Sequence, residues 1–300
     1  MTEPANDKQF ERWLQSMEPG STLLRAWPLT GGVSAQVTAL EVARADGDVL
    51  KMIVRQHGVA DFTRNPRIAA DEFTLLQRLH AAGLATPTPY YLDQSGDIFA
   101  TSIVVMEYIE GVPADRLSDD HVRQFAAHLS HLHALDPSKL NVAFLPQQVD
   151  IIAEQLRERP PMDERRVWEV LRAAWPIAQH NPSVLLHGDY WPGNTLWRDG
   201  RLVGIIDWED AALGDPLADL ANSRLELLWA AGVGAMEQFT RQYQSLASVD
   251  LTNLPYWDLC AALRPAKNMA AWGLDDHGER SMREALHWFI RQAIAKLPVT

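Results

Sequence analysis

Hydrophobic and polar residues alternate in short runs along the first third of the chain, and turn residues such as Gly31-Gly32 and Asp46-Gly47-Asp48 separate the runs. Alternation of this kind is typical of half-buried β-strands. We predict strands at residues 23–29, 37–43, 49–55, 90–93 and 99–107. Between the third and fourth of them, apolar residues recur at helical spacing, which predicts a helix at 67–82 that ends at Gly83.

The pattern changes to helical spacing beyond the segment Glu110-Gly111-Val112-Pro113. We predict helices at residues 118–135, 149–158, 163–179, 215–231, 234–247, 256–273 and 279–297. Two short apolar runs, 195–197 and 202–206, interrupt them and predict a hairpin. The sequence therefore predicts a bilobal α+β fold, with an N-terminal antiparallel-sheet lobe over residues 1–109 and a larger helical lobe over 110–300. Ligands commonly bind in the cleft between two lobes.

Composition narrows the possible partners. The 300 residues carry a net charge of −12, which argues against a general nucleic-acid-binding protein, because such a protein needs a basic surface. The acidity suits a cationic substrate, although it serves solubility equally well. One cysteine, Cys260, excludes a disulfide framework, and no run approaches the ~20 apolar residues of a membrane span. We expect a soluble cytoplasmic protein that binds neither nucleic acid nor membrane; its oligomeric state is not predicted.

The chemistry is concentrated in His187-Gly-Asp-Tyr-Trp-Pro-Gly-Asn194 and in Ile206-Asp-Trp-Glu209. The predicted hairpin brings Asn194 close to Asp207. Amide and carboxylate oxygens at these positions are suitable ligands for Mg²⁺. Asp189 then lies one loop away, where it can orient or deprotonate a hydroxyl. This combination suits phosphoryl transfer, whereas His187 is expected to brace the loop backbone by hydrogen bonds.

Glu72 lies on the apolar face of the predicted helix 67–82, and such a carboxylate is costly to bury without a cationic partner. Alternation in the strand 49–55 places Lys51 and Arg55 on one side of that strand. Either cation could reach Glu72 and face a phosphate as well. The alternative is an ordinary surface glutamate at an exposed helix edge.

Gly31-Gly32 and Ser34 lie between two predicted strands, where glycines allow backbone N–H groups to approach phosphate oxygens. The same residues fit a simple hairpin turn equally well. The segment is not a P-loop, because no Gly-Lys-Ser/Thr follows it before a helix.

Together these motifs resemble the aminoglycoside phosphotransferase and choline kinase family, whose fold is similar to that of the protein kinases. The resemblance runs from about residue 23 to the last helix. It depends most on the His187-to-Asn194 motif, on Asp207-Trp208-Glu209, and on the segment Gly214-Asp-Pro-Leu-Ala-Asp-Leu-Ala221. The chain has His187-Gly188 where protein kinases have His-Arg, and Asp-Trp-Glu where they have Asp-Phe-Gly. Both differences favour the branch that phosphorylates small molecules.

The resemblance implies a role for each matching position. Asp189 is the implied catalytic residue, and Asn194 and Asp207 are the implied Mg²⁺ ligands. Asp215 and Asp219 are implied to brace the catalytic region. The remaining implied contacts are to the nucleotide. Arg55, with Lys51 as the second choice, and Ser34 are implied to contact the phosphates, and Glu72 is the implied partner of the basic residue. The Glu107 carbonyl and the Ile109 N–H are implied to contact adenine.

We therefore predict a Mg²⁺-dependent kinase that transfers the γ-phosphate of ATP or GTP to a hydroxyl of a small acceptor, such as an aminoglycoside-like antibiotic or an amino alcohol. The sequence does not identify the acceptor. Candidate lining residues, which could equally be packing or solvated surface, are Tyr190, Trp191, Trp272, Asp275 and Asp276. The alternatives are a protein kinase, a non-catalytic nucleotide-binding regulator, and a metal-dependent hydrolase built from His187, Asp189 and Asp207.

Overall fold

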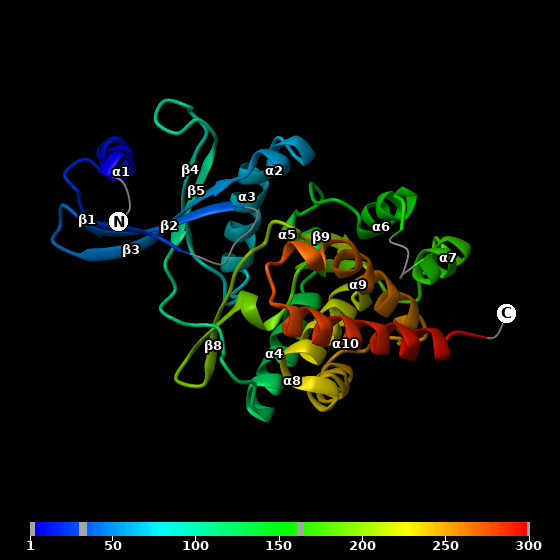
Figure 1. Ribbon diagram of the computed structural model, residues 1–300. Helices are drawn as coiled ribbons and strands as arrows, with labels where there is room; N and C mark the ends of the chain where they lie inside the picture. The colour runs from blue at the N-terminus through cyan, green and yellow to red at the C-terminus, as the bar shows by residue number, and fades with distance from the viewer. Residues whose placement is uncertain (1–3, 30–34, 161–164, 299–300) are drawn as a thin grey trace. The chain divides into compact units, whose positions relative to one another are not determined.

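A computed structural model describes residues 4–29, 35–160 and 165–298 of the protein. The chain divides into two compact units, Met1–Glu110 and Gly111–Thr300. Figure 1 shows a sheet-rich first unit and a mainly helical second unit, which confirms the predicted α+β class. The division falls one residue after the predicted lobe boundary, while the roles assigned to the two lobes stay predictions. No helix within the described ranges is both long enough and apolar enough to cross a membrane.

The first unit is built on one five-stranded antiparallel sheet with strand order β1-β2-β3-β5-β4. Its elements are α1 (Pro4–Met17), β1 (Thr22–Pro28), β2 (Ala35–Ala43), β3 (Val49–His57), α2 (Val59–Arg64), α3 (Ile68–Ala81), β4 (Pro89–Asp93) and β5 (Ile103–Glu107). The sheet is continuous because β2 pairs with β3 along its whole length, from Ala35 opposite His57 to Ala43 opposite Val49.

Alternation along β3 separates the two faces of this sheet. Met52 and Val54 are buried in an apolar cluster with Phe10, Trp13 and Leu14 of α1, so α1 supplies the core on one face. Arg55 and His57 point to the opposite face, where they contact Glu72 of α3. The contact between β3 and α3 is thus polar, whereas the sheet face toward α1 is apolar.

The second unit contains most of the helices and two small two-stranded sheets, β6–β9 and β7–β8. Its elements are α4 (Asp119–His133), α5 (Pro137–Leu140), α6 (Gln148–Arg157), α7 (Arg165–Ala174), β6 (Val184–Leu186), η1 (Pro192–Asn194), β7 (Thr195–Arg198), β8 (Arg201–Ile205), β9 (Ala212–Gly214), α8 (Leu217–Leu246), α9 (Leu254–Asn268), η2 (Met269–Ala271) and α10 (Asp276–Ala295). Helix α8 packs against α4, α9 and α10. The two small sheets carry the loops that contain Asp189, Asn194 and Asp207.

Some predicted elements differ from those observed. The strand predicted at 99–107 begins only at Ile103, because Phe99 instead packs its ring against Phe10 of α1 at 5.6 Å between centroids. The helix predicted at 163–179 ends earlier in the structure, because α7 stops at Ala174, directly before Trp175-Pro176. The helices predicted at 215–231 and 234–247 form the single element α8, which is kinked at Gly232 with a φ of 82°.

Candidate active site

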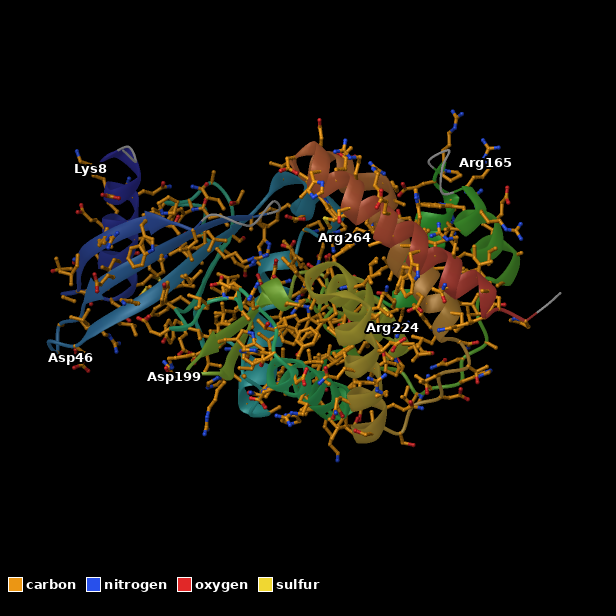
Figure 2. The ribbon with its side chains drawn as sticks, turned by 60° about the horizontal axis from the view of Figure 1, so that its bottom comes forward. Lys8, Asp46, Arg165, Asp199, Arg224 and Arg264 are labelled. Atoms are coloured by element: carbon orange, nitrogen blue, oxygen red, sulfur yellow. The ribbon has the colours of Figure 1, made fainter. Side chains whose placement is uncertain are left out.

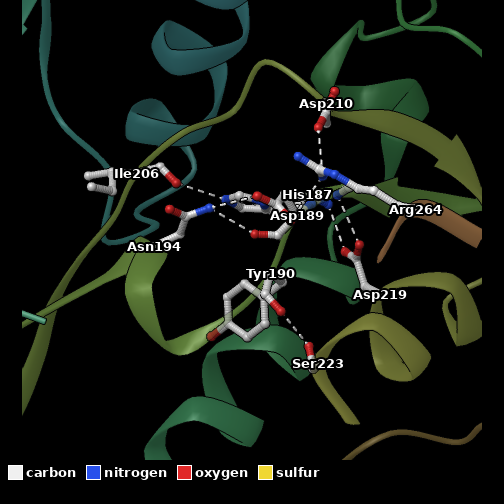
Figure 3. Close-up of polar contacts among 10 residues, drawn as sticks. His187, Asp189, Tyr190, Asn194, Ile206, Asp210, Asp219, Ser223 and Arg264 are labelled. Carbon is white, nitrogen blue, oxygen red and sulfur yellow. Dashed lines mark hydrogen bonds and ion pairs between the residues drawn. The ribbon is translucent and has the colours of Figure 1, made fainter. Parts of the chain in front are cut away.

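The loop between β6 and β7 carries the His187–Asn194 motif, and His187 fixes its backbone from inside. The His187 imidazole accepts a hydrogen bond from the Asp189 N–H through Nδ1 (3.2 Å) and donates one from Nε2 to the Ile206 carbonyl (3.1 Å). Burial lowers the pKa of this histidine, so the neutral ring that both bonds require is favoured. This confirms the prediction that His187 braces the loop, and it links the loop to the end of β8 (Figure 3).

Asp219 of α8 holds the same loop from the other side. Its carboxylate accepts hydrogen bonds from the backbone N–H groups of His187 (2.7 Å) and Gly188 (2.9 Å), and lies 3.2 Å from His133 Nε2 on α4. Burial opposes ionisation, but the contacts with His133 and His187 lower the pKa of Asp219 below its ordinary value. The bracing role implied for Asp219 is therefore visible in its contacts.

Gly188 is required by the close approach of a neighbouring loop. Its φ of 83° is a left-handed conformation, and a Cβ added there would overlap the backbone carbonyl oxygen of Asp210. The loop before Asp189 and the segment after β8 are consequently in direct contact.

Asp189, Asn194 and Asp207 come together as the sequence predicted. Asn194 Nδ2 donates to the Asp189 carbonyl oxygen (3.0 Å) and to Asp189 Oδ2 (3.2 Å). The Ile206 N–H donates to the Asn194 carbonyl (3.0 Å), so the hairpin places Asp207 beside them. Because the Asn194 amide nitrogen is turned toward Asp189, its side-chain oxygen remains as a hard donor, and the Asp207 carboxylate is the second hard donor that this hairpin carries. These donors fit Mg²⁺. Asp207 itself has a φ of 70°, an uncommon backbone conformation for a non-glycine residue.

Arg264 of α9 completes the surroundings of Asp189 and was not among the residues predicted from the sequence. Its Nη1 lies 3.2 Å from Asp189 Oδ1 and 3.2 Å from Asp210 Oδ2 (Figure 3). Burial raises the pKa of Asp189 to about 7, with Arg264 opposing this effect and Asp210 and Asp207 adding to it. The carboxylate proposed as a proton acceptor therefore titrates near neutral pH.

Glu226 of α8 is a third acidic group near Asp189, after Asp207 and Asp210. Burial, and secondarily the charge of Asp189, raise the pKa of Glu226 to about 8, while Arg264 opposes the shift. At neutral pH Glu226 is therefore mostly protonated and adds little negative charge to this site.

In the first unit, Glu72 is buried and has two basic partners. Arg55 Nε lies 3.5 Å from Glu72 Oε2, and His57 Nε2 lies 2.8 Å from the same oxygen. Burial disfavours the charged form, but Arg55 and then His57 lower the pKa of Glu72 below its ordinary value. The exposed-glutamate alternative is wrong, and His57 was missed because the predicted strand ended at residue 55.

The second basic candidate, Lys51, is directed elsewhere. Its ammonium group forms an exposed ion pair with Glu110 at 2.6 Å and does not reach Glu72. Glu107 ends β5, where its side chain accepts hydrogen bonds from the backbone N–H and hydroxyl of Thr88, and Ile109 follows two residues later. Their predicted adenine contacts remain predictions, as does the phosphate contact of Ser34, which lies outside the described residues.

Two of the candidate acceptor-lining residues have structural roles. Tyr190 is fully buried, stacks on Phe125, and donates its hydroxyl hydrogen bond to the Phe125 carbonyl at 3.0 Å. It therefore packs the interior and does not line a site. Asp275 is the N-cap of α10 and accepts a hydrogen bond from the Gly278 N–H at 2.7 Å.

Comparison with known proteins places this geometry in a family. Residues 27–291 match the model of the phosphotransferase enzyme family. Viomycin phosphotransferase of Streptomyces vinaceus is 29% identical over 201 residues, covering 59% of this chain and 70% of that protein. Acyl-CoA dehydrogenase family member 11 of Rattus norvegicus is 26% identical over 232 residues, covering 64% of this chain. The chain spans only 29% of that longer relative.

Solved structures show the same fold. The chain superposes on spectinomycin phosphotransferase, in complex with ADP and spectinomycin, with a TM-score of 0.65 and 17% identity, covering 96% of this chain and 98% of that one. Because the family match spans most of the residues, the protein belongs to the phosphotransferase enzyme family, as its motifs indicated.

Proposed function

We propose that this protein is a kinase that transfers the γ-phosphoryl group of ATP or GTP to a hydroxyl of a small molecule. The acceptor oxygen forms a bond to the γ-phosphorus, the bond from that phosphorus to the β–γ bridging oxygen breaks, and the nucleoside diphosphate leaves. The hydroxyl proton passes to Asp189. The observation that carries the proposal is the Asp189 carboxylate, held by Asn194 and Arg264 on a loop fixed by His187 and Asp219.

Asn194 and Asp207 are the proposed ligands of Mg²⁺, which when bound would neutralise phosphate charge. Arg55 is the proposed phosphate contact in the first unit, with Glu72 and His57 fixing its position. The Glu107 carbonyl and Ile109 N–H are the proposed adenine contacts, and Ser34 is a proposed phosphate contact. Use of ATP or GTP as co-substrate fits a cytoplasmic protein.

Most of the rate acceleration would come from positioning, because phosphoryl transfer needs little covalent chemistry from the protein. The names of viomycin phosphotransferase and spectinomycin phosphotransferase support a small hydroxylated acceptor. Aminoglycoside-like antibiotics and amino alcohols are therefore the first acceptors to test.

The test is nucleotide consumption by the purified protein with Mg²⁺ and a panel of aminoglycosides, macrolides, amino alcohols, hydroxy acids and sugars. We expect Asp189→Asn to lower turnover by at least ~10²-fold, the usual minimum for losing a positioned proton acceptor, while nucleotide still binds. Asp207→Asn should weaken the Mg²⁺ dependence. Asp199→Asn is the matched control, because Asp199 lies in the exposed β7–β8 turn.

Each alternative gives a different result in the same experiment. A protein kinase would label itself or casein and ignore the small molecules. A nucleotide-binding regulator would bind ATP analogues without transfer to any acceptor. A metal-dependent hydrolase would act without nucleotide, and full turnover by Asp189→Asn with the true acceptor would remove Asp189 from its proposed role.

A further inference from the structure

Arg264 holds a guanidinium group beside the proposed catalytic carboxylate, and only one of its nitrogens is occupied. Nη1 makes both contacts, to Asp189 Oδ1 and to Asp210 Oδ2, each at 3.2 Å. Among the described residues, Nε and Nη2 of Arg264 donate to no protein atom, and the side chain is 52% exposed. The edge formed by Nε and Nη2 is therefore open, whereas Nη1 is fixed by the two carboxylates.

The fixed Nη1 gives this arginine a defined orientation. Asp189 and Asp210 belong to two different loops, which Gly188 keeps in contact. The backbone of Arg264 lies in the last turns of α9, a helix that packs against α7, α8 and α10, and Leu263 and Ala266 on either side of it are buried. Figure 2 labels Arg264 among the helices of the second unit. A planar guanidinium held in this way is organised in advance for two parallel hydrogen bonds to an anionic group.

The charges around Arg264 also indicate which kind of acceptor molecule can bind beside it. Asp189 and Asp210 contact only Nη1, so an acceptor ammonium placed against the open Nε–Nη2 edge would meet the like charge of the guanidinium. Glu226, whose pKa is raised to about 8, adds little negative charge at neutral pH. The open donors of Arg264 thus offer a complementary partner to an anion, next to the position where the acceptor hydroxyl must lie.

Resting on the proposed function, we propose that Arg264 binds a carboxylate of the acceptor, so that the substrate is a hydroxy acid and not a polycation. The Nε–Nη2 edge receives the carboxylate, and Asp189 receives the hydroxyl. Because one residue contacts both Asp189 and the carboxylate, the two functional groups of the acceptor are separated by a short chain. Arg264 is then a specificity-determining residue of this site.

The experiment compares matched acceptors. Hydroxy acids of three to six carbons are assayed with Mg-nucleotide against the amides of the same acids and the amino alcohols of the same length. We expect kcat/KM for the acids to exceed that for the amides by about 10- to 100-fold, the range for a charged hydrogen-bonded pair. In Arg264→Gln this preference should fall to within about threefold, mainly through KM, and Arg264→Lys should restore part of it because lysine keeps the charge without the planar fork.

Arg280→Gln, at an exposed position of α10, is the control, because it removes the same charge elsewhere. Thermal unfolding of each variant verifies that it is folded. A wild-type protein that prefers amino alcohols or amides overturns the inference while the kinase proposal stands. An unchanged acid preference in Arg264→Gln also overturns it. So does a loss of kcat that is equal for every acceptor and leaves the acid preference intact, which would limit Arg264 to holding Asp189. If none of these acceptors supports nucleotide consumption, the inference is overturned, and the kinase proposal falls with it only if the aminoglycosides, macrolides and sugars of the wider panel support none either.

Discussion

Glu226 should make the protein less stable as the pH rises through the neutral range. Its pKa is raised by burial from 4.5 to about 8. The unfolded chain therefore loses this proton near pH 4.5, whereas the folded protein retains it until about pH 8. Between these values the unfolded state binds fewer protons, so the free energy of unfolding falls with increasing pH and then levels off. At 1.36 kcal/mol per pKa unit, the gap corresponds to an upper limit of roughly 5 kcal/mol.

Glu226→Gln keeps the shape of the side chain and cannot ionise, so it removes this penalty. We expect the variant to be more stable than the wild type by about 2–4 kcal/mol at pH 8.5 and by less than about 1 kcal/mol at pH 5. The measurement is urea-induced unfolding of both proteins at the two pH values. Glu284→Gln, at an exposed position of α10, makes the same change in net charge and should give no such pH-dependent gain. A stability difference for Glu226→Gln that is equal at pH 5 and pH 8.5 would refute the reasoning.

The remaining predictions concern the loop and its supports. Gly188→Ala should lower the melting temperature and reduce turnover more than ~10-fold, because the added methyl group overlaps the Asp210 backbone. In the control Gly200→Ala, the methyl group meets no atom within 4 Å, so this change should cost only the ~1–2 kcal/mol of its left-handed backbone. Asp219→Asn should lower the free energy of unfolding by about 2–4 kcal/mol, measured by urea titration, since it replaces a buried ionised acceptor of two backbone N–H groups. Arg224 makes a bidentate pair with Asp258 at 2.9 and 3.0 Å, and Arg224→Ala should cost about 3–5 kcal/mol by leaving a buried carboxylate unpaired. Equal unfolding curves for Arg224→Ala and wild type would contradict that expectation.

Features encoded locally could be predicted from the sequence. The β7–β8 hairpin brings Asn194 and Asp207 together within a short stretch of chain, and the alternation of β3 places Arg55 toward Glu72. The same alternation continues to His57, so extending the strand by two residues would have found the closest partner of Glu72.

Features set by distant packing could not be predicted in the same way. Arg264 is 75 residues from Asp189 along the chain, and no motif marks it, because its position depends on how α9 packs in the second unit. Tyr190 lies inside the most informative motif, yet its side chain packs on Phe125. A motif position therefore does not by itself show which way a side chain points. Helix α1 did leave a signal, since Phe10, Trp13 and Leu14 recur at helical spacing, but the short polar segment around them obscured it.

That first helix matters for any attempt to trim the protein. The family match begins at residue 27, after α1 and most of β1. A chain shortened to the matched residues would lose Phe10, Trp13 and Leu14 and would leave the side chains of Leu40, Met52 and Val54 facing water. An uncovered apolar sheet face of this kind promotes aggregation. Removing α1 would therefore lower the solubility of the protein by exposing this sheet face, without changing any residue of the candidate active site.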